Sequence, residues 1–261
     1  MFYVRLFFHY WMQYLKIRME YRSDFFVQLV TDLMFQGVNL VFIIVVFSHT
    51  ADLSGWSREE VIFIYGYFLV PFSLFASFFN LWDFNERYII KGELDRVLTR
   101  PAHSLFQVIL ETMTPESLSG GITGLLVMGW AGWKMGLELS WYDPLLFILF
   151  VLGGGAIYAG IYILLTSISL FSDSKTDIQP IMFNVGNYGR YPVDVYNKVI
   201  RTVLTWVIPF AFVGFYPASF FLNEERWMTL ALLTPVVGLV WLYLGIKVWN
   251  WGIRNYRGAG N

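Results

Sequence analysis

The sequence contains no cysteine and only three histidines, His9, His49 and His103. The absence of cysteine excludes disulfides, thiolate nucleophiles, iron–sulfur clusters and cysteine-based zinc sites. None of the histidines lies inside a long apolar segment, so an intramembrane haem, a histidine-built metal centre or a Ser-His-Asp hydrolase has no histidine there. The sequence therefore predicts a chain with no metal, no cofactor and no catalytic residues of its own.

Charged residues are also scarce. They make up 14% of the 261 residues, while 57% are hydrophobic and 20% aromatic; soluble domains carry about 25% charged residues. A disordered chain would instead be charge-rich and poor in aromatic residues. The formal net charge of −1 gives no argument for a nucleic-acid partner. The composition predicts a protein embedded in membrane lipid.

No lysine in the sequence follows a glycine. A phosphate-binding loop needs Gly-Lys-Ser/Thr, because the lysine must reach the phosphates from a glycine-rich turn. The chain is therefore not expected to bind ATP in that way or to be an enzyme. If it performs uphill transport, the energy must come from an ion gradient or from another subunit.

Six segments are long and apolar enough to cross a bilayer as helices, which needs about 20 residues each. Pro71, Pro209 and Pro235 lie inside them and predict kinks. The fold class expected is an all-α membrane protein with six transmembrane helices. The expected spans are residues 25–47, 61–82, 114–133, 144–171, 199–219 and 227–249.

Lysine and arginine are distributed unequally between the segments that connect the spans. Three residues, Arg58, Lys134 and Arg226, lie on one side, and the other 15 of the 18 lie on the opposite side. The side richer in these cations is the cytoplasmic one, so both termini are predicted to be cytoplasmic. The cations assigned to that side are Arg5, Lys16, Arg18, Arg22, Arg87, Lys91, Arg96, Arg100, Lys175, Arg190, Lys198, Arg201, Lys247, Arg254 and Arg257.

Residues 1–22 precede the first span and alternate with the period of an amphipathic helix. Polar residues such as Arg5 and Lys16 fall on one face, and aromatic residues such as Phe7 and Trp11 fall on the other. This pattern is typical of a helix that lies in the cytoplasmic membrane interface. The alternative is a helix packed on a soluble partner.

The first span carries Gln28, Asp32, Gln36 and Asn39, which share one helix face. Polar and ionisable groups inside a span usually face the bundle interior, a subunit contact or a wet cavity. The stripe therefore marks either a transport path or a subunit interface. The alternative is hydrogen bonding that only holds helices together.

Two carboxylates lie near the start of the third span. Glu111 and Glu116 are five residues apart, so they do not share one helix face, which weakens the case for a paired acid/base site. Glu116 is nearer the membrane and is therefore the better candidate for the transport path or subunit interface.

The segment after the second span reads Gly-Glu-Leu-Asp-Arg-Val-Leu-Thr-Arg-Pro, residues 92–101. Gly92 is expected to end the preceding helix, Glu93 to begin a short one, and Pro101 to stop it. Acids at the start and Arg100 at the end suit the helix dipole. On physical grounds alone, such a helix is most simply a solvated connector.

The same segment resembles the G-x-x-D-x-x-L-x-R-P signature of bacterial type-2 ABC exporter permeases. Two further stretches resemble this family in order along the chain: 191–218, with Tyr191-Pro192, Arg201 and Tyr216-Pro217-Ala218, and the tail 251–260. The resemblance covers essentially the whole chain.

The resemblance implies one transmembrane domain, 1–261, with an interfacial helix at 1–22, six spans within 25–249 and a cytoplasmic tail at 250–261. It implies a subunit of a drug-resistance or lipid-type exporter in the bacterial cytoplasmic membrane, which moves a hydrophobic or amphipathic substrate outward. ATP and Mg would bind a separate ATPase, and a second permease, identical or homologous, would complete the path.

In such permeases the loop between spans two and three is the coupling helix, which docks on the ATPase. The residues that the resemblance places there are Gly92, Glu93, Asp95, Arg96, Arg100 and Pro101. The alternative function is a secondary transporter driven by an ion gradient, with Asp32 or Glu116 as the coupling acid.

Overall fold

The computed structural model describes residues 1–171 and 178–256, and within them the chain is helical apart from loops and one isolated bridge between Leu53 and Trp56. The α-helices are α1 Phe2–Glu20, α2 Arg22–His49, α3 Arg58–Phe78, α4 Glu93–Leu98, α5 Ser104–Thr112, α6 Leu118–Met135, α7 Asp143–Ile168, α8 Ile178–Asn187, α9 Lys198–Thr202, α10 Phe215–Phe221 and α11 Glu225–Asn255. Short 3-10 or π-helical segments are η1 Asn85–Ile90, η2 Pro115–Ser117, η3 Ser169–Phe171, η4 Tyr188–Arg190, η5 Val193–Val195, η6 Val203–Val207 and η7 Phe210–Phe212.

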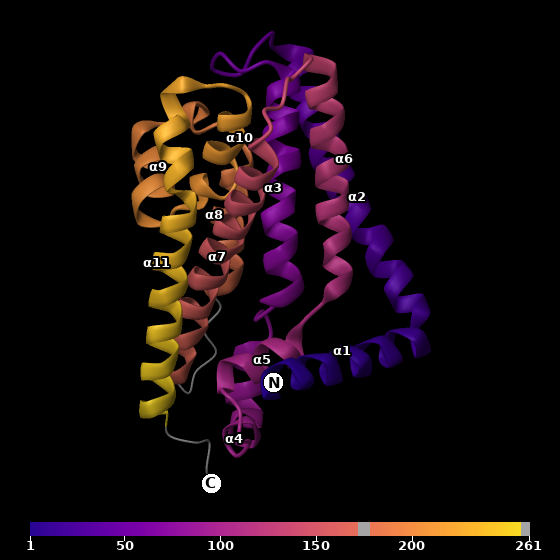
Figure 1. The fold of residues 1–261 in the computed structure, drawn as a ribbon, viewed down its shortest axis with the longest axis vertical. Helices are drawn as coiled ribbons and strands as arrows, with labels where there is room; N and C mark the ends of the chain where they lie inside the picture. Colours follow the sequence, from indigo (N-terminus) through magenta and orange to yellow (C-terminus); the bar gives the residue numbers. More distant parts are fainter. Residues whose placement is uncertain (172–177, 257–261) are drawn as a thin grey trace.

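The long helices run roughly along the long axis of the molecule, and α1 lies across one end beside α4 and α5 (Figure 1). We call this end, formed by α1, η1, α4 and α5, the platform. The loops that precede α3, α7 and α11 lie at the far end (Figure 1). The molecule therefore has two chemically different ends joined by a helical bundle.

Four helical segments are long and apolar enough to cross a membrane, judged by length and composition within the described residues: α2, α3, α7 with η3, and α11. Residues 198–207 and 210–221 also pass this test as a pair, but they are bent by 76° at the break that contains Pro209. Both ends of this pair lie at the far end, because Asp194 binds both Arg201 and Arg226, so the pair forms a re-entrant loop and not the expected fifth crossing. The third expected span corresponds to α6, which has 18 residues and is rich in glycine. The all-helical fold is thus confirmed, with four helices that meet the test for a membrane span within the described residues, while the expected count of six is not confirmed.

The helix α2 carries its polar side chains on the packed side and its apolar side chains on the outside. Only 6% of an apolar stretch of 18 residues in α2 is buried, and Ile43 is the one fully buried residue of this helix. Gln36 and Asn39 are half-buried, whereas Met34 and Val38 are each 67% exposed. A helix that faces lipid presents an apolar outer surface of this kind.

Glycines allow the bundle helices to approach closely. A Cβ at Gly238 in α11 would lie 2.4 Å from the carbonyl oxygen of Gly153 in α7, and one at Gly245 would lie 2.5 Å from that of Gly160. In membranes, small residues of this kind let helix backbones pack together. The helices α7 and α11 therefore pack closely against each other, and together they connect the far end of the molecule to the platform end.

The structure corrects the expected position of residues 190–201. Asp194 forms ion pairs with Arg201 at 3.2 Å and with Arg226 at 3.5 Å, and it accepts a hydrogen bond from the Trp56 indole at 3.4 Å. Arg226 and Trp56 lie at the far end, so Arg201 and the adjacent Lys198 lie there too. Their assignment to the cytoplasmic side with the platform cations is wrong.

The reason for this error is that the chain crosses the bundle before the expected fifth span begins. Gln179, at the start of α8, bonds the Leu81 carbonyl at 2.9 Å, near the platform end of α3. Eleven residues later, Arg190 lies buried against α2 and α3. Two other cations in the count, Lys175 and Arg257, and residues 258–260 of the tail lie outside the described residues.

Candidate functional site

The short helix expected after Gly92 is present and is anchored by its own sequence. Gly92 adopts the left-handed conformation, with φ 71°, which permits the sharp turn between η1 and α4. Leu94 and Val97, three residues apart, share one face of α4 and are both completely buried. The amphipathic pattern of this segment thus places its charged residues on the outer face of the platform.

The buried face of α4 belongs to an apolar cluster that extends beyond the platform. The cluster includes Ile163 near the end of α7, Trp249 near the end of α11, and Leu105 in α5. The Trp249 indole also donates a hydrogen bond to the Ser104 hydroxyl at 3.1 Å. A force on α4 would therefore reach α7 and α11 through closely packed side chains.

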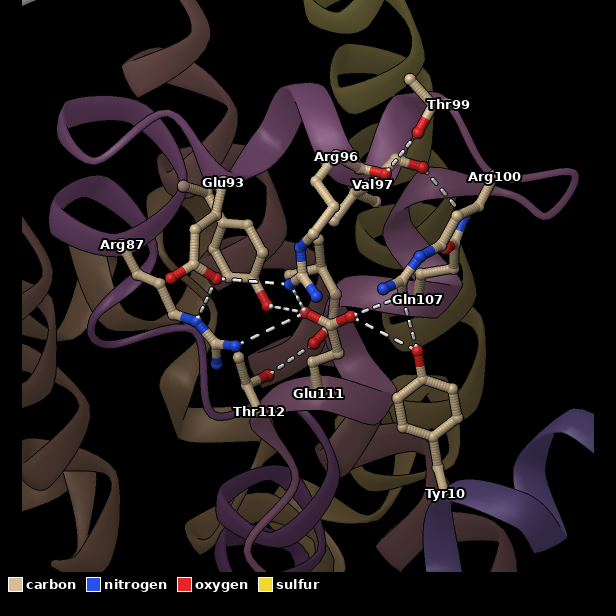
Figure 2. Close-up of polar contacts among 12 residues, drawn as sticks. Tyr10, Arg87, Glu93, Arg96, Val97, Thr99, Arg100, Gln107, Glu111 and Thr112 are labelled. Carbon is tan, nitrogen blue, oxygen red and sulfur yellow. Dashed lines mark hydrogen bonds and ion pairs between the residues drawn. The ribbon is translucent and has the colours of Figure 1, made fainter. Parts of the chain in front are cut away.

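Glu111, on α5, is the electrostatic centre of the platform (Figure 2). Its side chain is only 7% exposed, and its two oxygens bind Arg100 at 2.8 Å, Arg96 at 2.9 Å and Arg87 at 3.5 Å. The Tyr88 hydroxyl donates to Glu111 Oε2 at 3.0 Å. One carboxylate thus connects η1, α4 and the segment that follows α4.

Glu93 lies beside this centre and holds two of the same arginines. It bonds Arg87 at 2.9 Å and Arg96 at 3.3 Å. The Arg87 guanidinium holds the pKa of the Glu93 carboxyl below its usual range, with smaller contributions from the charges of Arg96 and Lys91. Glu93 is therefore ionised at neutral pH, and three arginines face two acidic side chains in this cluster.

The candidate coupling residues thus differ in what they offer to a partner. Arg96 and Arg100 turn toward Glu111 and are 48% and 36% exposed at the side chain. Asp95 is exposed and forms no ion pair within the described part of the chain. Among the candidate coupling residues, Asp95 is therefore the charged group most free to meet another protein.

The helix α1 is attached to the platform by two polar contacts. The Tyr10 hydroxyl donates to Glu111 Oε1 at 3.3 Å and accepts from Arg100 Nη1 at 2.9 Å. Near its other end, Arg18 pairs with Glu116, whose side chain is fully buried. Glu116 therefore joins α1 to the start of α6, and it does not line either of the two cavities beside the polar stripe of α2.

The polar stripe of α2 faces a groove between α2, α3, α6 and α8. Asp32, Gln36 and Asn39 line a cavity of about 230 Å³. Gln28 lines a second cavity of about 140 Å³. Phe72 and Phe183 line both cavities, which therefore adjoin.

Arg190, on η4, closes one wall of the larger cavity. It is 6% exposed, donates to Asn39 Oδ1 at 2.5 Å, bonds the Asn187 side chain, and lies 5.4 Å from the Phe68 ring centroid. The Tyr65 hydroxyl donates to the Gln36 carbonyl at 3.0 Å. The groove thus contains a guanidinium, a carboxylate and two amides within an apolar surround.

The sequence comparison identifies the family to which these features belong. A family model described as ABC-2 family transporter protein matches residues 33–260. The chain belongs to this family. Neither the curated proteins nor the solved structures compared with the chain gave a match.

As an ABC-2 permease, the chain is a multi-pass membrane protein and a transport subunit that is not itself catalytic. Family membership implies an ABC transport system with an ATPase partner, and it does not favour the ion-gradient alternative. The resemblance stated from residues 92–101 and 191–218 is confirmed at the level of the family.

Two residues of the permease were missed or misjudged from sequence. Glu111 was set aside because it lacks an acidic partner on its own helix face, yet its partners are cations from other segments. Arg190 was counted as a loop cation, yet it is the only charged residue between Ile178 and Val193, and it is buried. A single charge inside a long apolar segment was the signal that could have identified it.

Proposed function

We propose that this ABC-2 permease is the membrane subunit of an exporter that moves a hydrophobic or amphipathic substrate out of a bacterial cell. A separate ATPase binds ATP and Mg and drives the movement. The chain crosses the cytoplasmic membrane six times with its platform inside, and α1 lies in the membrane interface. The two crossings in addition to α2, α3, α7 and α11 are α6 and the segment from α8 to η5. A second permease, of the same or a homologous kind, covers the outer surface of α2.

The corrected distribution of cations supports this orientation. Arg58, Lys134, Lys198, Arg201 and Arg226 belong to the far end. The platform end has more, and cytoplasmic ends are the richer ones. The described cations at the platform end of the molecule, including those at the platform ends of α2 and α11, are Arg5, Lys16, Arg18, Arg22, Arg87, Lys91, Arg96, Arg100, Lys247 and Arg254.

The observation that carries the proposal is the attachment of α4. Its outer face presents Asp95 toward solvent, while Leu94 and Val97 join the cluster that includes Ile163 of α7 and Trp249 of α11. A helix that is exposed on one face and fixed to two long helices on the other can transmit a displacement by the ATPase. The role of Gly92 is to set the turn that leads into α4, and Pro101 follows its end.

The experiment that tests coupling is the substitution Asp95→Lys in the complete transporter. Reversal of an interfacial charge should weaken ATPase binding or leave the ATPase bound but uncoupled, since loss of a desolvated charged partner costs about 2–5 kcal/mol. Co-purification of the ATPase and substrate-stimulated ATP hydrolysis measure the two outcomes. Because Asp95 forms no ion pair in the described chain, the amount of folded permease should not change.

The matched control is Glu225→Lys, which makes a similar charge change on an exposed acid at the far end, in the first turn of α11. It should leave ATPase co-purification and hydrolysis at the wild-type level. If Asp95→Lys also behaves as wild type in both assays, α4 is a solvated connector, and the coupling role is wrong.

A further inference from the structure

Arg190 forms no ion pair with a carboxylate of the described chain. Its hydrogen-bond partners are the side-chain amides of Asn39 and Asn187, and no carboxylate lies within ion-pair distance. Its Nε is buried without a partner. A buried guanidinium in a membrane protein is costly and usually faces a cavity or a specific anionic group.

The platform arginines provide a contrast within the same chain. Arg87, Arg96 and Arg100 are each at least 36% exposed at the side chain, and all three contact Glu111. Arg190 is only 6% exposed and has no acid. The arginine that most needs a counter-charge is therefore the one that lacks it.

The cavity beside Arg190 has room for an anion. The cavity has a volume of about 230 Å³. One water molecule occupies about 30 Å³, so the cavity is several times larger than a single water. The Oε1 atom of Gln36, another residue of its lining, is also buried without a partner; it is an acceptor, so it suits a donor such as a hydroxyl of the bound molecule and not the anion itself. Asp32 lines the same cavity but lies seven residues before Asn39, which corresponds to about 10 Å along the helix.

The adjoining cavity suits an apolar chain. It is lined mainly by apolar and aromatic side chains that include Phe72, Phe75, Trp82 and Phe183. Trp82 and Phe183 pack edge to face with their ring centroids 5.9 Å apart. The groove therefore runs from a buried cation to an aromatic surface, as an amphiphile with an anionic head requires.

We propose that the groove binds the anionic headgroup of an amphiphilic cargo, and that Arg190 contacts this headgroup. This inference rests on the proposed export function and specifies the class of its substrate. Guanidinium groups bind phosphate and carboxylate through two parallel hydrogen bonds, and such charge-assisted bonds are about twice as strong as neutral ones. When no cargo is bound, Asn39 and Asn187 hold the guanidinium in place through their hydrogen bonds.

The test measures binding of two fluorescent lipids with identical tails to the full-length permease in detergent, without ATPase or ATP. One probe is phosphatidylglycerol, which is anionic, and the other is phosphatidylcholine, which has no net charge. Wild type should bind the anionic probe at least about tenfold more tightly, and Arg190→Gln should reduce this ratio to about one. Arg190→Lys, which keeps the charge without the planar fork, should retain part of it.

Two further variants make the test independent of folding defects. Asn39→Asp places a carboxylate beside Arg190, so it should abolish the anionic preference while the melting temperature stays at or above that of wild type. Arg226→Gln removes an arginine that is 62% exposed at the far end, and it should keep the wild-type preference.

The proposal is overturned if wild type shows no preference for the anionic probe, or if Arg190→Gln and Asn39→Asp both retain it. Displacement of the anionic probe by millimolar inorganic phosphate would overturn the requirement for an apolar tail, and lack of displacement supports it. Because the assay contains no ATPase, its failure is distinguishable from failure of coupling, which the Asp95→Lys experiment measures separately.

Discussion

Glu111 and Arg190 are two largely buried charged residues of this permease, and they are arranged in opposite ways. Glu111 is surrounded by three arginines and two tyrosine hydroxyls, which exceeds what one carboxylate needs (Figure 2). Arg190 has two amides, one aromatic ring and no acid. The platform thus neutralises its buried charge, whereas the groove leaves its charge uncompensated.

This difference indicates that the two regions serve different purposes. A carboxylate with redundant partners fixes the relative positions of α1, η1, α4 and α5, which the role that we propose for α4 in coupling requires. A buried charge without a counter-ion reduces stability, and proteins retain such groups where function requires them. The comparison predicts that the two sites respond to neutralisation with opposite signs.

The largest effect is expected for Glu111→Gln. The amide keeps the shape but removes the negative charge, so three neighbouring arginines are left with one carboxylate, that of Glu93. Removing one partner of a buried ion pair costs about 3–5 kcal/mol, and because the arginines here are partly exposed we expect the lower end, about 3 kcal/mol. The free energy of unfolding in detergent, followed by denaturant titration, measures this loss.

The control for that substitution is Asp83→Asn, which neutralises an exposed acid that precedes η1 and makes no ion pair within the described residues. It should change the free energy of unfolding by less than about 0.5 kcal/mol. If Glu111→Gln and Asp83→Asn have the same stability, Glu111 does not organise the platform.

A smaller effect of the opposite sign is expected for Arg190→Met. Methionine is unbranched and flexible, so it can occupy the arginine's space while removing the buried charge. Replacement of buried ionic groups by apolar ones of similar volume is often neutral or stabilising by 1–4 kcal/mol, and we expect a gain of about 1–2 kcal/mol. Thermal unfolding should show a higher midpoint together with loss of the preference for anionic lipid.

A lower midpoint for Arg190→Met would mean that the guanidinium holds α2 against η4 as a structural contact. In that case Glu111 and Arg190 would both be structural contacts, and the platform and the groove would differ in geometry but not in function. The variant Asn187→Ala is a useful companion, because it removes one hydrogen-bond partner of Arg190 but keeps the charge. It should be destabilising by about 1 kcal/mol.

Local rules predicted the elements whose structure is determined by neighbours in sequence. Gly92 and the spacing of Leu94 and Val97 were sufficient for α4, and helical periodicity placed Gln28, Asp32, Gln36 and Asn39 on one face that the structure directs into a groove. Such patterns depend on backbone conformation and on 3.6-residue periodicity, which the sequence carries directly.

Contacts between distant segments could not be predicted in this way. The partners of Glu111 are up to 101 residues away, and Arg190 meets Asn39 across 151 residues. The position of residues 198–201 was predicted wrongly because a charge count assumes straight crossings, whereas α8 already carries the chain toward the far end. The proline at position 209 predicted a bend. It did not predict the angle of 76° or that residues 198–221 would depart from a straight crossing.

The smallest effect is expected for Tyr10→Phe, which tests how redundant the platform is. The hydroxyl is shared between Glu111 and Arg100, while both of these groups also bind each other at 2.8 Å. Burial raises the pKa of the Tyr10 phenol, and the negative charge of Glu111 adds to the rise, so the phenol remains a neutral donor at physiological pH. Loss of one such hydrogen bond costs about 1 kcal/mol.

The loss should be local, because Tyr10 is one of the few polar attachments of α1, a helix that has no fully buried residue. Hydrogen exchange should therefore become faster in α1 and stay unchanged in α4 and α5, whose contacts with Glu111 remain. Tyr3→Phe is the matched control, because Tyr3 packs its ring against Phe106 and makes no described hydrogen bond through its hydroxyl. Faster exchange throughout α4 in Tyr10→Phe would show that α1 supports the coupling helix directly, which would make the interfacial helix part of the mechanical connection between ATPase and groove.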